Sequence, residues 1–146
     1  MALSKDVVDA QIKAIGRFDS FGTKKEIAFL PEVLREGETI LFLTSGMMDG
    51  NTWLITATDM RLIFLDKGMI YGLKQVEYPY DKISTISHTT GMLMGKISIG
   101  TSSGVVVIDC IAKQDVAKMV EIVTQYIQSR HTYVNPAADA HHGASN

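Results

Sequence analysis

Apolar residues recur at helical spacing in the first part of the chain. Residues 4–16 predict an amphipathic helix, which Ser4 can cap at its start and Gly16 can end. The apolar side of this helix carries Val8, Ile12 and Ile15.

A second, shorter helix is expected after it. Thr23 and Glu26 have the spacing of a capping box, in which each side chain bonds the backbone N–H of the other residue. Pro31 then either breaks this helix or starts one more turn, and Gly37 closes the helical region.

After residue 37 the pattern becomes that of β-strands. Seven segments are separated by turn signals, which predicts an antiparallel sandwich or barrel. The segments are residues 38–47, 52–58, 60–67, 69–79, 82–90, 95–102 and 105–111. Asp49-Gly50, between the first two, is a dipeptide that tight hairpin turns favour. In the third segment alternate residues face opposite sides of the sheet, Leu62 and Phe64 on one side, Ile63 and Leu65 on the other.

The last periodic segment predicts one more helix. It runs from Gln114 to about Arg130, with apolar residues at i, i+3, i+4 and i+7. Such a helix needs an apolar surface, and the open end of a barrel offers one. Residues 131–146 have no period and are mostly small or polar, which predicts a flexible tail.

Composition narrows the class of protein. A length of 146 residues suits one domain, and 46% hydrophobic residues argue against bulk disorder. The net charge of −2 argues against binding to nucleic acid. The single cysteine, Cys110, favours a reducing compartment. No segment has the ~20 consecutive apolar residues of a transmembrane helix. We therefore expect a soluble cytoplasmic protein.

Two motifs resemble bacterial pleckstrin-homology-like (PH-like) domains, with the YokE-like group of short domains the most similar. The first is "ITATDMRLIFLDKG", in which the matching positions are Thr58, Arg61, Leu62, Ile63 and Phe64. The second is "VEYPYDKISTISHTTGMLMGKISI", in which they are Tyr80, Ile83, Ser84 and Ile86, followed by the turn glycines Gly91 and Gly95. The resemblance spans about residues 35–130.

This resemblance implies a mainly β (α+β) fold: a PH-like, partly open antiparallel β-barrel of about seven strands, capped by a C-terminal α-helix. We expect an N-terminal helical extension at residues 1–36, the PH-like domain at 37–130 and the flexible tail at 131–146. Relatives in this superfold include phosphoinositide-binding modules, which need basic residues in the loop between the first two strands. That loop, Ser45 to Asn51, contains Asp49 and no Lys or Arg, which argues against headgroup binding there.

Few residues are candidates for a functional site. Arg61 is either a ligand contact or, in the interpretation we favour, a structural arginine that bonds Asp59 or a backbone carbonyl. Four methionines lie at predicted turns, and they either plug the ends of the barrel or form an interaction surface: Met47, Met48, Met92 and Met94.

The remaining candidates do not indicate chemistry. His88 has no nucleophile and carboxylate at a suitable spacing, and Cys110 has no electropositive neighbour. His141 and His142 are adjacent in the predicted tail, which is poor spacing for metal ligands. We predict no catalytic residue, no cofactor and no metal.

The sequence therefore favours a non-enzymatic PH-like interaction module that binds protein and associates with copies of itself. The alternative is a peripheral membrane or lipid-binding module, in which the N-terminal amphipathic helix lies on a bilayer. The polar side of that helix has mixed charge, which would make its electrostatic attraction to a membrane weak.

Overall fold

The structure, a computed structural model, describes residues 3–16, 22–68 and 72–134. Within these residues seven strands form one open antiparallel sheet, in the order β4-β3-β2-β1-β7-β6-β5. The strands are β1 (Ile40–Met48), β2 (Asn51–Thr58), β3 (Arg61–Lys67), β4 (Leu73–Pro79), β5 (Ile83–Thr90), β6 (Met94–Thr101) and β7 (Gly104–Ala112). The helices are α1 (Lys5–Ile15), α2 (Lys24–Val33), α3 (Lys113–Val134) and the short 3-10 helix η1 (Tyr80–Lys82).

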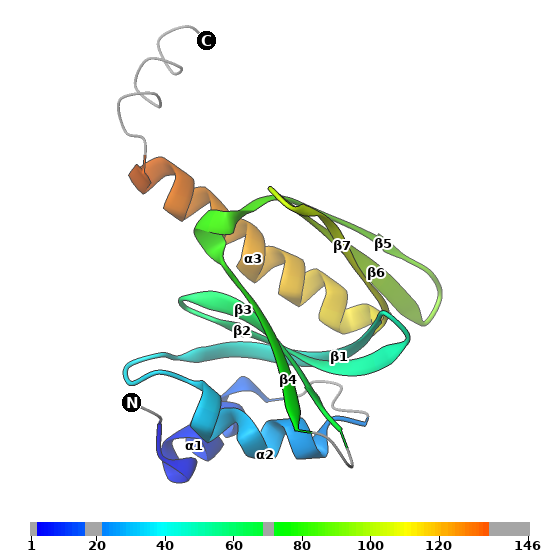
Figure 1. The fold of residues 1–146 in the computed structure, drawn as a ribbon. Coiled ribbons are helices and arrows are strands. Elements are labelled where there is room, and N and C mark those ends of the chain that lie inside the picture. Colours follow the sequence, from blue (N-terminus) through cyan, green and yellow to red (C-terminus); the bar gives the residue numbers. More distant parts are fainter. Residues whose placement is uncertain (1–2, 17–21, 69–71, 135–146) are drawn as a thin grey trace, which may run out of the picture.

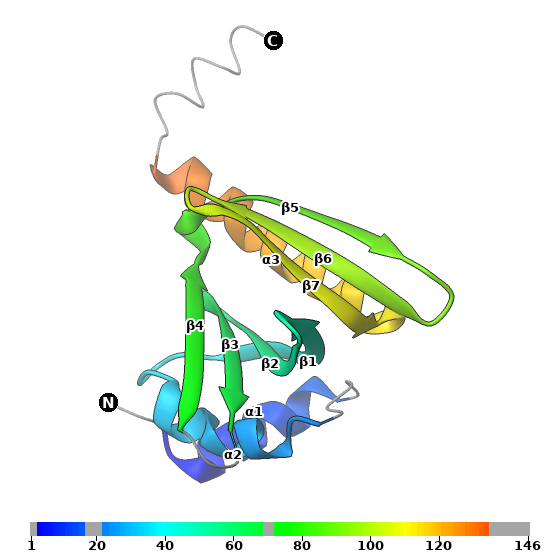
Figure 2. The same ribbon diagram turned by 45° about the vertical axis from the view of Figure 1, so that its right-hand side comes forward.

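The sheet folds over between β1 and β7, where one registered pair, Met47 opposite Asp109, joins the two strands. Gly46 allows the close approach, because a Cβ atom there would lie 2.6 Å from Cγ2 of Ile108. One half of the sheet is then β1–β4 and the other β5–β7, with α3 between them (Figures 1 and 2). This partly open antiparallel barrel with a C-terminal helix confirms the expected fold class.

The turn between β1 and β2 is the predicted tight hairpin. Asp49 and Gly50 have φ angles of 53° and 81°, as a two-residue turn of type I′ requires. The turn sets the register, so that Met48 lies opposite Asn51. This register decides which of two adjacent methionines faces the core.

The strands β1 to β3 are buried on both faces, which divides the core in two. Leu62 and Phe64 belong to the inner core, around α3, whereas Ile63 and Leu65 belong to the outer core, under α1 and α2. The alternation predicted for this strand is confirmed. The outer core consists of Val8, Leu30, Leu34, Ile40, Leu43, Leu54, Ile63 and Leu65.

The N-terminal helices follow the sequence pattern with one correction. Ser4 caps α1 by accepting a hydrogen bond from the Val7 N–H. The capping box predicted for α2 is wrong: Thr23 makes no capping hydrogen bond through its side chain, and Oε2 of Glu26 accepts instead from the Lys67 N–H at 2.6 Å. Glu26 does not bond the start of its own helix because α2 packs beside the end of β3. There the Lys67 N–H also needs an acceptor, and Glu26 provides it.

Some predicted boundaries also move. The helix α2 runs through Pro31 to Val33, and the Leu34 N–H still bonds the Leu30 carbonyl across the proline. The helix α3 runs from Lys113 to Val134, past its predicted end at about Arg130. The first proline after the start of α3 is Pro136. The rest of the predicted tail, and the first residues predicted for the fourth strand, lie outside the described residues.

No helix in the described ranges is both long and apolar enough to cross a bilayer.

The outer core predicts that the N-terminal helices stabilise the barrel. Leu30 of α2 is fully buried against the sheet, so Leu30→Ala should lower the free energy of unfolding by about 2–5 kcal/mol in a single cooperative transition. Urea denaturation followed by tryptophan fluorescence would measure this, since Trp53 lies in the barrel. Val7→Ala, at a site that is 44% exposed, is the control. An unchanged midpoint for Leu30→Ala would show that the helices do not contribute to the stability of the barrel.

Candidate functional site

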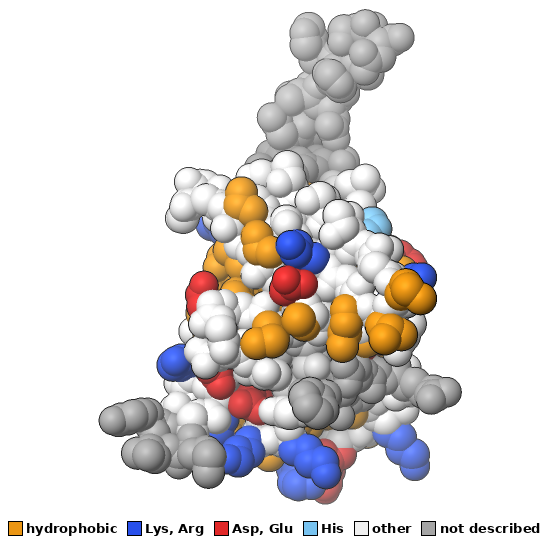
Figure 3. Space-filling view, turned by 90° about the vertical axis from the view of Figure 1, so that its right-hand side faces the viewer, with side chains coloured by type: hydrophobic (Ala, Val, Ile, Leu, Met, Phe, Trp, Pro, Cys, Tyr) orange, Lys and Arg blue, Asp and Glu red, His pale blue; other side chains and the backbone are white. Residues whose placement is uncertain are grey.

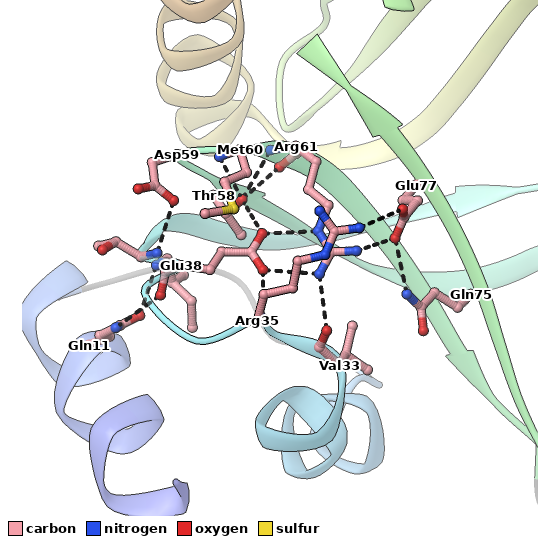
Figure 4. A network of polar contacts seen from close by, with 12 residues as sticks. Gln11, Val33, Arg35, Glu38, Thr58, Asp59, Met60, Arg61, Gln75 and Glu77 are labelled. Atoms are coloured by element: carbon pink, nitrogen blue, oxygen red, sulfur yellow. Dashed lines mark hydrogen bonds and ion pairs between the residues drawn. The ribbon is translucent and has the colours of Figure 1, made fainter. Parts of the chain in front are cut away.

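Arg61, the first residue of β3, lies in a buried polar network between the barrel and the N-terminal helices (Figure 4). Its side chain is 3% exposed and that of Glu38 is fully buried. Nε and Nη2 of Arg61 each donate to the Glu38 carboxylate at 3.0 Å. The remaining guanidinium contacts are Nη2 to the Val33 carbonyl, at 3.0 Å, and Nη1 to the Glu77 carboxylate. All three nitrogens therefore have acceptors within the protein.

The Glu38 carboxylate is held from several directions. It accepts from the Arg35 N–H at 2.9 Å and from the Thr58 hydroxyl at 2.6 Å. Burial by itself would raise the pKa of Glu38, but the hydrogen bonds from Arg61, Arg35 and Thr58 outweigh burial and hold this pKa below its ordinary value. Burial opposes the charge of Arg61 too, yet Glu38 raises the pKa of the guanidinium. Both groups are thus charged in the folded protein.

The same network fastens the N-terminal helices. The Gln11 side chain in α1 donates to the Glu38 carbonyl and accepts from the Ile40 N–H at 2.8 Å. The bond from Arg61 to Val33 reaches the last residue of α2. Arg61 therefore joins β3 directly to the end of α2 and, through Glu38, to α1, and its guanidinium is occupied by acceptors within the protein.

The partner first considered for Arg61, Asp59, has a different role. Its carboxylate accepts from the Thr39 N–H at 3.0 Å, and the backbone N–H of Asp59 donates to the Thr39 carbonyl. Sequence reasoning missed Glu38 because it lies 23 positions before Arg61, at the start of a predicted strand. An acidic residue that opens an apolar segment was the available signal.

The four candidate methionines do not form one surface. Met48 is 8% exposed and belongs to the inner core, so its assignment to an interaction surface is wrong. The reason is alternation: Met47 and Met48 are neighbours in β1 and point to opposite faces. Met47, Met92 and Met94 are 39%, 91% and 50% exposed.

The exposed methionines lie near apolar residues that the sequence did not single out. Val105 and Val107 of β7 are 70% and 44% exposed, and Leu93 beside Met92 is 80% exposed. We call the outer side of β7 and β6, with the adjoining end of β1, the uncovered face. Its apolar side chains are Met47, Met94, Val105 and Val107. Met92 and Leu93 form the tip of the β5–β6 hairpin, which extends beyond the rest of the fold (Figure 2).

The uncovered face exists because the helices cover only half of the sheet. The outer core under α1 and α2 draws its strand residues from β1, β2 and β3. The strands β5 to β7 use only their inner side, where Ile97, Ile99 and Ile108 pack into the inner core. Figure 3 shows apolar side chains gathered on the resulting surface.

His88 and Asp109, a histidine and a carboxylate on the same half of the sheet, do not lie together. His88 is registered opposite Ile97, which faces the inner core, whereas Asp109 follows the inward-facing Ile108 and lies on the outer side of β7. They are therefore on opposite faces of the sheet. The described residues contain no group of three or more potential metal ligands, and His141 and His142 lie outside them.

A pocket of about 550 Å³ lies between the start of α2, the start of β2 and the end of β3. It adjoins the loop from Ser45 to Asn51, which itself carries no basic residue. Its charged lining residues are Lys24, Lys25, Glu26, Asp66 and Lys67. Sequence reasoning confined to that loop missed these three lysines, which come from other elements. Two carboxylates offset them, and Lys67 is stacked over the Phe29 ring at 5.1 Å.

Comparison with known proteins assigns the fold to a family. A model of the bacterial PH domain matches residues 34–125, more than half of the chain. The chain belongs to the bacterial PH domain family. This confirms the resemblance seen in the two sequence motifs. No curated protein matches the sequence.

Solved bacterial PH domains have the same fold. A pleckstrin homology domain from Shewanella amazonensis SB2B is 20% identical, with a TM-score of 0.54 over 72% of this chain and 97% of that one. A DUF1696 family protein with a pleckstrin-homology domain, from Shewanella loihica PV-4, is 16% identical, with a TM-score of 0.53 over 70% of this chain and 91% of that one. The PH-domain fold generally serves as a non-catalytic interaction module.

The network around Arg61 makes a prediction about stability. Arg61→Met leaves the Glu38 carboxylate buried without its cation, which should cost about 3–5 kcal/mol in the free energy of unfolding. Arg35→Met is the matched control, because Arg35 also pairs with Glu77 but its side chain is 58% exposed. The control should change stability by less than about 1 kcal/mol. Equal effects of the two substitutions in urea denaturation would refute the structural role of Arg61.

Proposed function

We propose that this PH domain is a non-enzymatic interaction module that associates with copies of itself through the uncovered face. One observation carries the proposal: Val105, Val107, Met47 and Met94 are exposed on a single face of the sheet. Scattered apolar residues on a surface are ordinary, but a group on one sheet face indicates a binding surface.

The structure of this face suits a protein partner. The outward side chains are carried by paired strands, so their backbone is already ordered and loses little freedom on binding. The methionines at its two sides have flexible, polarisable side chains that adapt to an opposing surface. An apolar face that carries methionines has the composition of the buried core of an interface between subunits.

The alternative proposal of membrane binding depended on the apolar side of the N-terminal helix α1, and that side is buried. Val8 of α1 is 1% exposed in the outer core, and Ile12 and Ile15 pack against the same cluster. The apolar side of α1 is therefore occupied by the sheet and is not available to a bilayer. This supports the protein-binding proposal over the lipid-binding one.

We place the module in the cytoplasm. The only cysteine of the sequence, Cys110, is an exposed free thiol in β7. A reducing compartment would keep this thiol from forming disulfides between copies, which supports a cytoplasmic location.

The proposal predicts a mass that depends on concentration. Sedimentation equilibrium of the full chain at micromolar concentrations should give an average mass above that of one chain. Val107→Lys should return it to one chain, because a charge would be buried at the interface. Val7→Lys is the matched control, since Val7 and Val107 are both 44% exposed and Val7 lies on α1. A wild-type mass of one chain throughout would overturn the proposal, as would equal effects of the two variants.

A further inference from the structure

The uncovered face carries one acidic and one basic residue among its apolar side chains. Met47 in β1 is registered opposite Asp109 in β7. In the register of β6 and β7, Lys96 falls between Gly95, which is opposite Ile111, and Ile97, which is opposite Ile108. A β-bulge there places two β7 residues, Asp109 and Cys110, against Lys96 alone.

The two charges point outward on neighbouring strands. Gly95 and Ile97 are buried on the inner side of β6, so Lys96 between them faces outward, and it is exposed. Asp109 is exposed as well.

Neither charge has an ionic partner within the described part of the chain. The ion pairs found there include neither Lys96 nor Asp109. One oxygen of Asp109 accepts a hydrogen bond from the Cys110 N–H at 2.8 Å. Each residue can therefore take a partner of opposite charge from outside.

A second copy of the chain supplies those partners. In a two-fold symmetric interface, if residue i of one subunit meets residue j of the other, then j also meets i. Adjacent opposite charges satisfy this rule, because Lys96 of one copy can meet Asp109 of the next and the reverse contact forms at the same time. A bilayer could not compensate Asp109 in this way, and the apolar surface around it would carry the charge into lipid.

We propose, resting on the self-association proposed above, that two copies pack face to face about a two-fold axis, with Lys96 of each copy opposite Asp109 of the other. Val105 and Val107 then lie along β7 on one side of the Lys96 and Asp109 pairs. Met47 lies beside these pairs on β1. The apolar contacts provide the affinity, and the two charge pairs set the register.

Charge reversal tests this arrangement. Lys96→Asp converts both contacts to Asp against Asp, and Asp109→Lys converts both to Lys against Lys. Each single variant should therefore associate at least about tenfold more weakly than wild type. The double variant K96D/D109K restores both pairs with their signs exchanged and should return to near the wild-type dissociation constant.

Mixing the two single variants gives a sharper result. In a dimer of one Lys96→Asp chain with one Asp109→Lys chain, both contacts are again between opposite charges. Native mass spectrometry of the mixture, with one variant labelled with 15N, should show the heterodimer in large excess over either homodimer. Lys118→Asp and Asp81→Lys, at exposed sites on α3 and η1, are the matched controls and should associate like wild type.

The outcomes separate this inference from the proposed function. Suppose that Val107→Lys is monomeric but neither charge reversal weakens association. Then the copies associate through the uncovered face, as proposed, but not in the two-fold register that pairs Lys96 with Asp109. If the single variants weaken association but neither the double variant nor the mixture recovers, the pairing of Lys96 with Asp109 is wrong. If wild type does not associate at all, the proposed function itself fails. Far-UV circular dichroism of each variant checks that a loss of association is not a loss of fold.

Discussion

The buried ion pair between Glu38 and Arg61 is the interaction on which the arrangement of the molecule depends. Removing two charges from water is costly, and here the cost is offset because every guanidinium nitrogen and both carboxylate oxygens have partners. Beyond the pair itself, these partners come from β2, β4, the chain before β1 and the end of α2. The pair therefore fixes the helices on one half of the sheet.

Because both helices lie on β1 to β3, no helix covers the outer side of β5 to β7. The packing of the core thus explains why the face proposed for self-association is exposed. The strands β1 to β3 bury both faces, whereas β5 to β7 bury one. A sheet covered on one side only must expose its outer side to water or to a partner. On β7 that outer side carries two valines and a charge without an ionic partner, which is a surface better suited to a partner than to water.

Local patterns predicted most of the fold, and the contacts that matter for function were not local. The hairpin at Asp49-Gly50 and the helix after residue 112 follow from turn chemistry and periodicity. The pairing of Glu38 with Arg61 depends on how distant segments meet, which no spacing reveals. The run "VVV" in β7 has the composition of a strand buried on both faces, yet two of its three valines are exposed because no helix reaches them. Likewise, only the register of β1 separates the buried Met48 from the exposed Met47.

The central claim is that the uncovered face, and no other surface, joins two copies of the chain. Methyl NMR spectra recorded over a dilution series test it most directly, because Val and Met methyl groups report their own surroundings. The account predicts that shifts change with concentration for Met47, Met94, Val105 and Val107, while Val7 on α1 and the buried Met119 on α3 stay constant. Concentration-dependent shifts confined to α1 and α2, or to the edge strand β4, would contradict it.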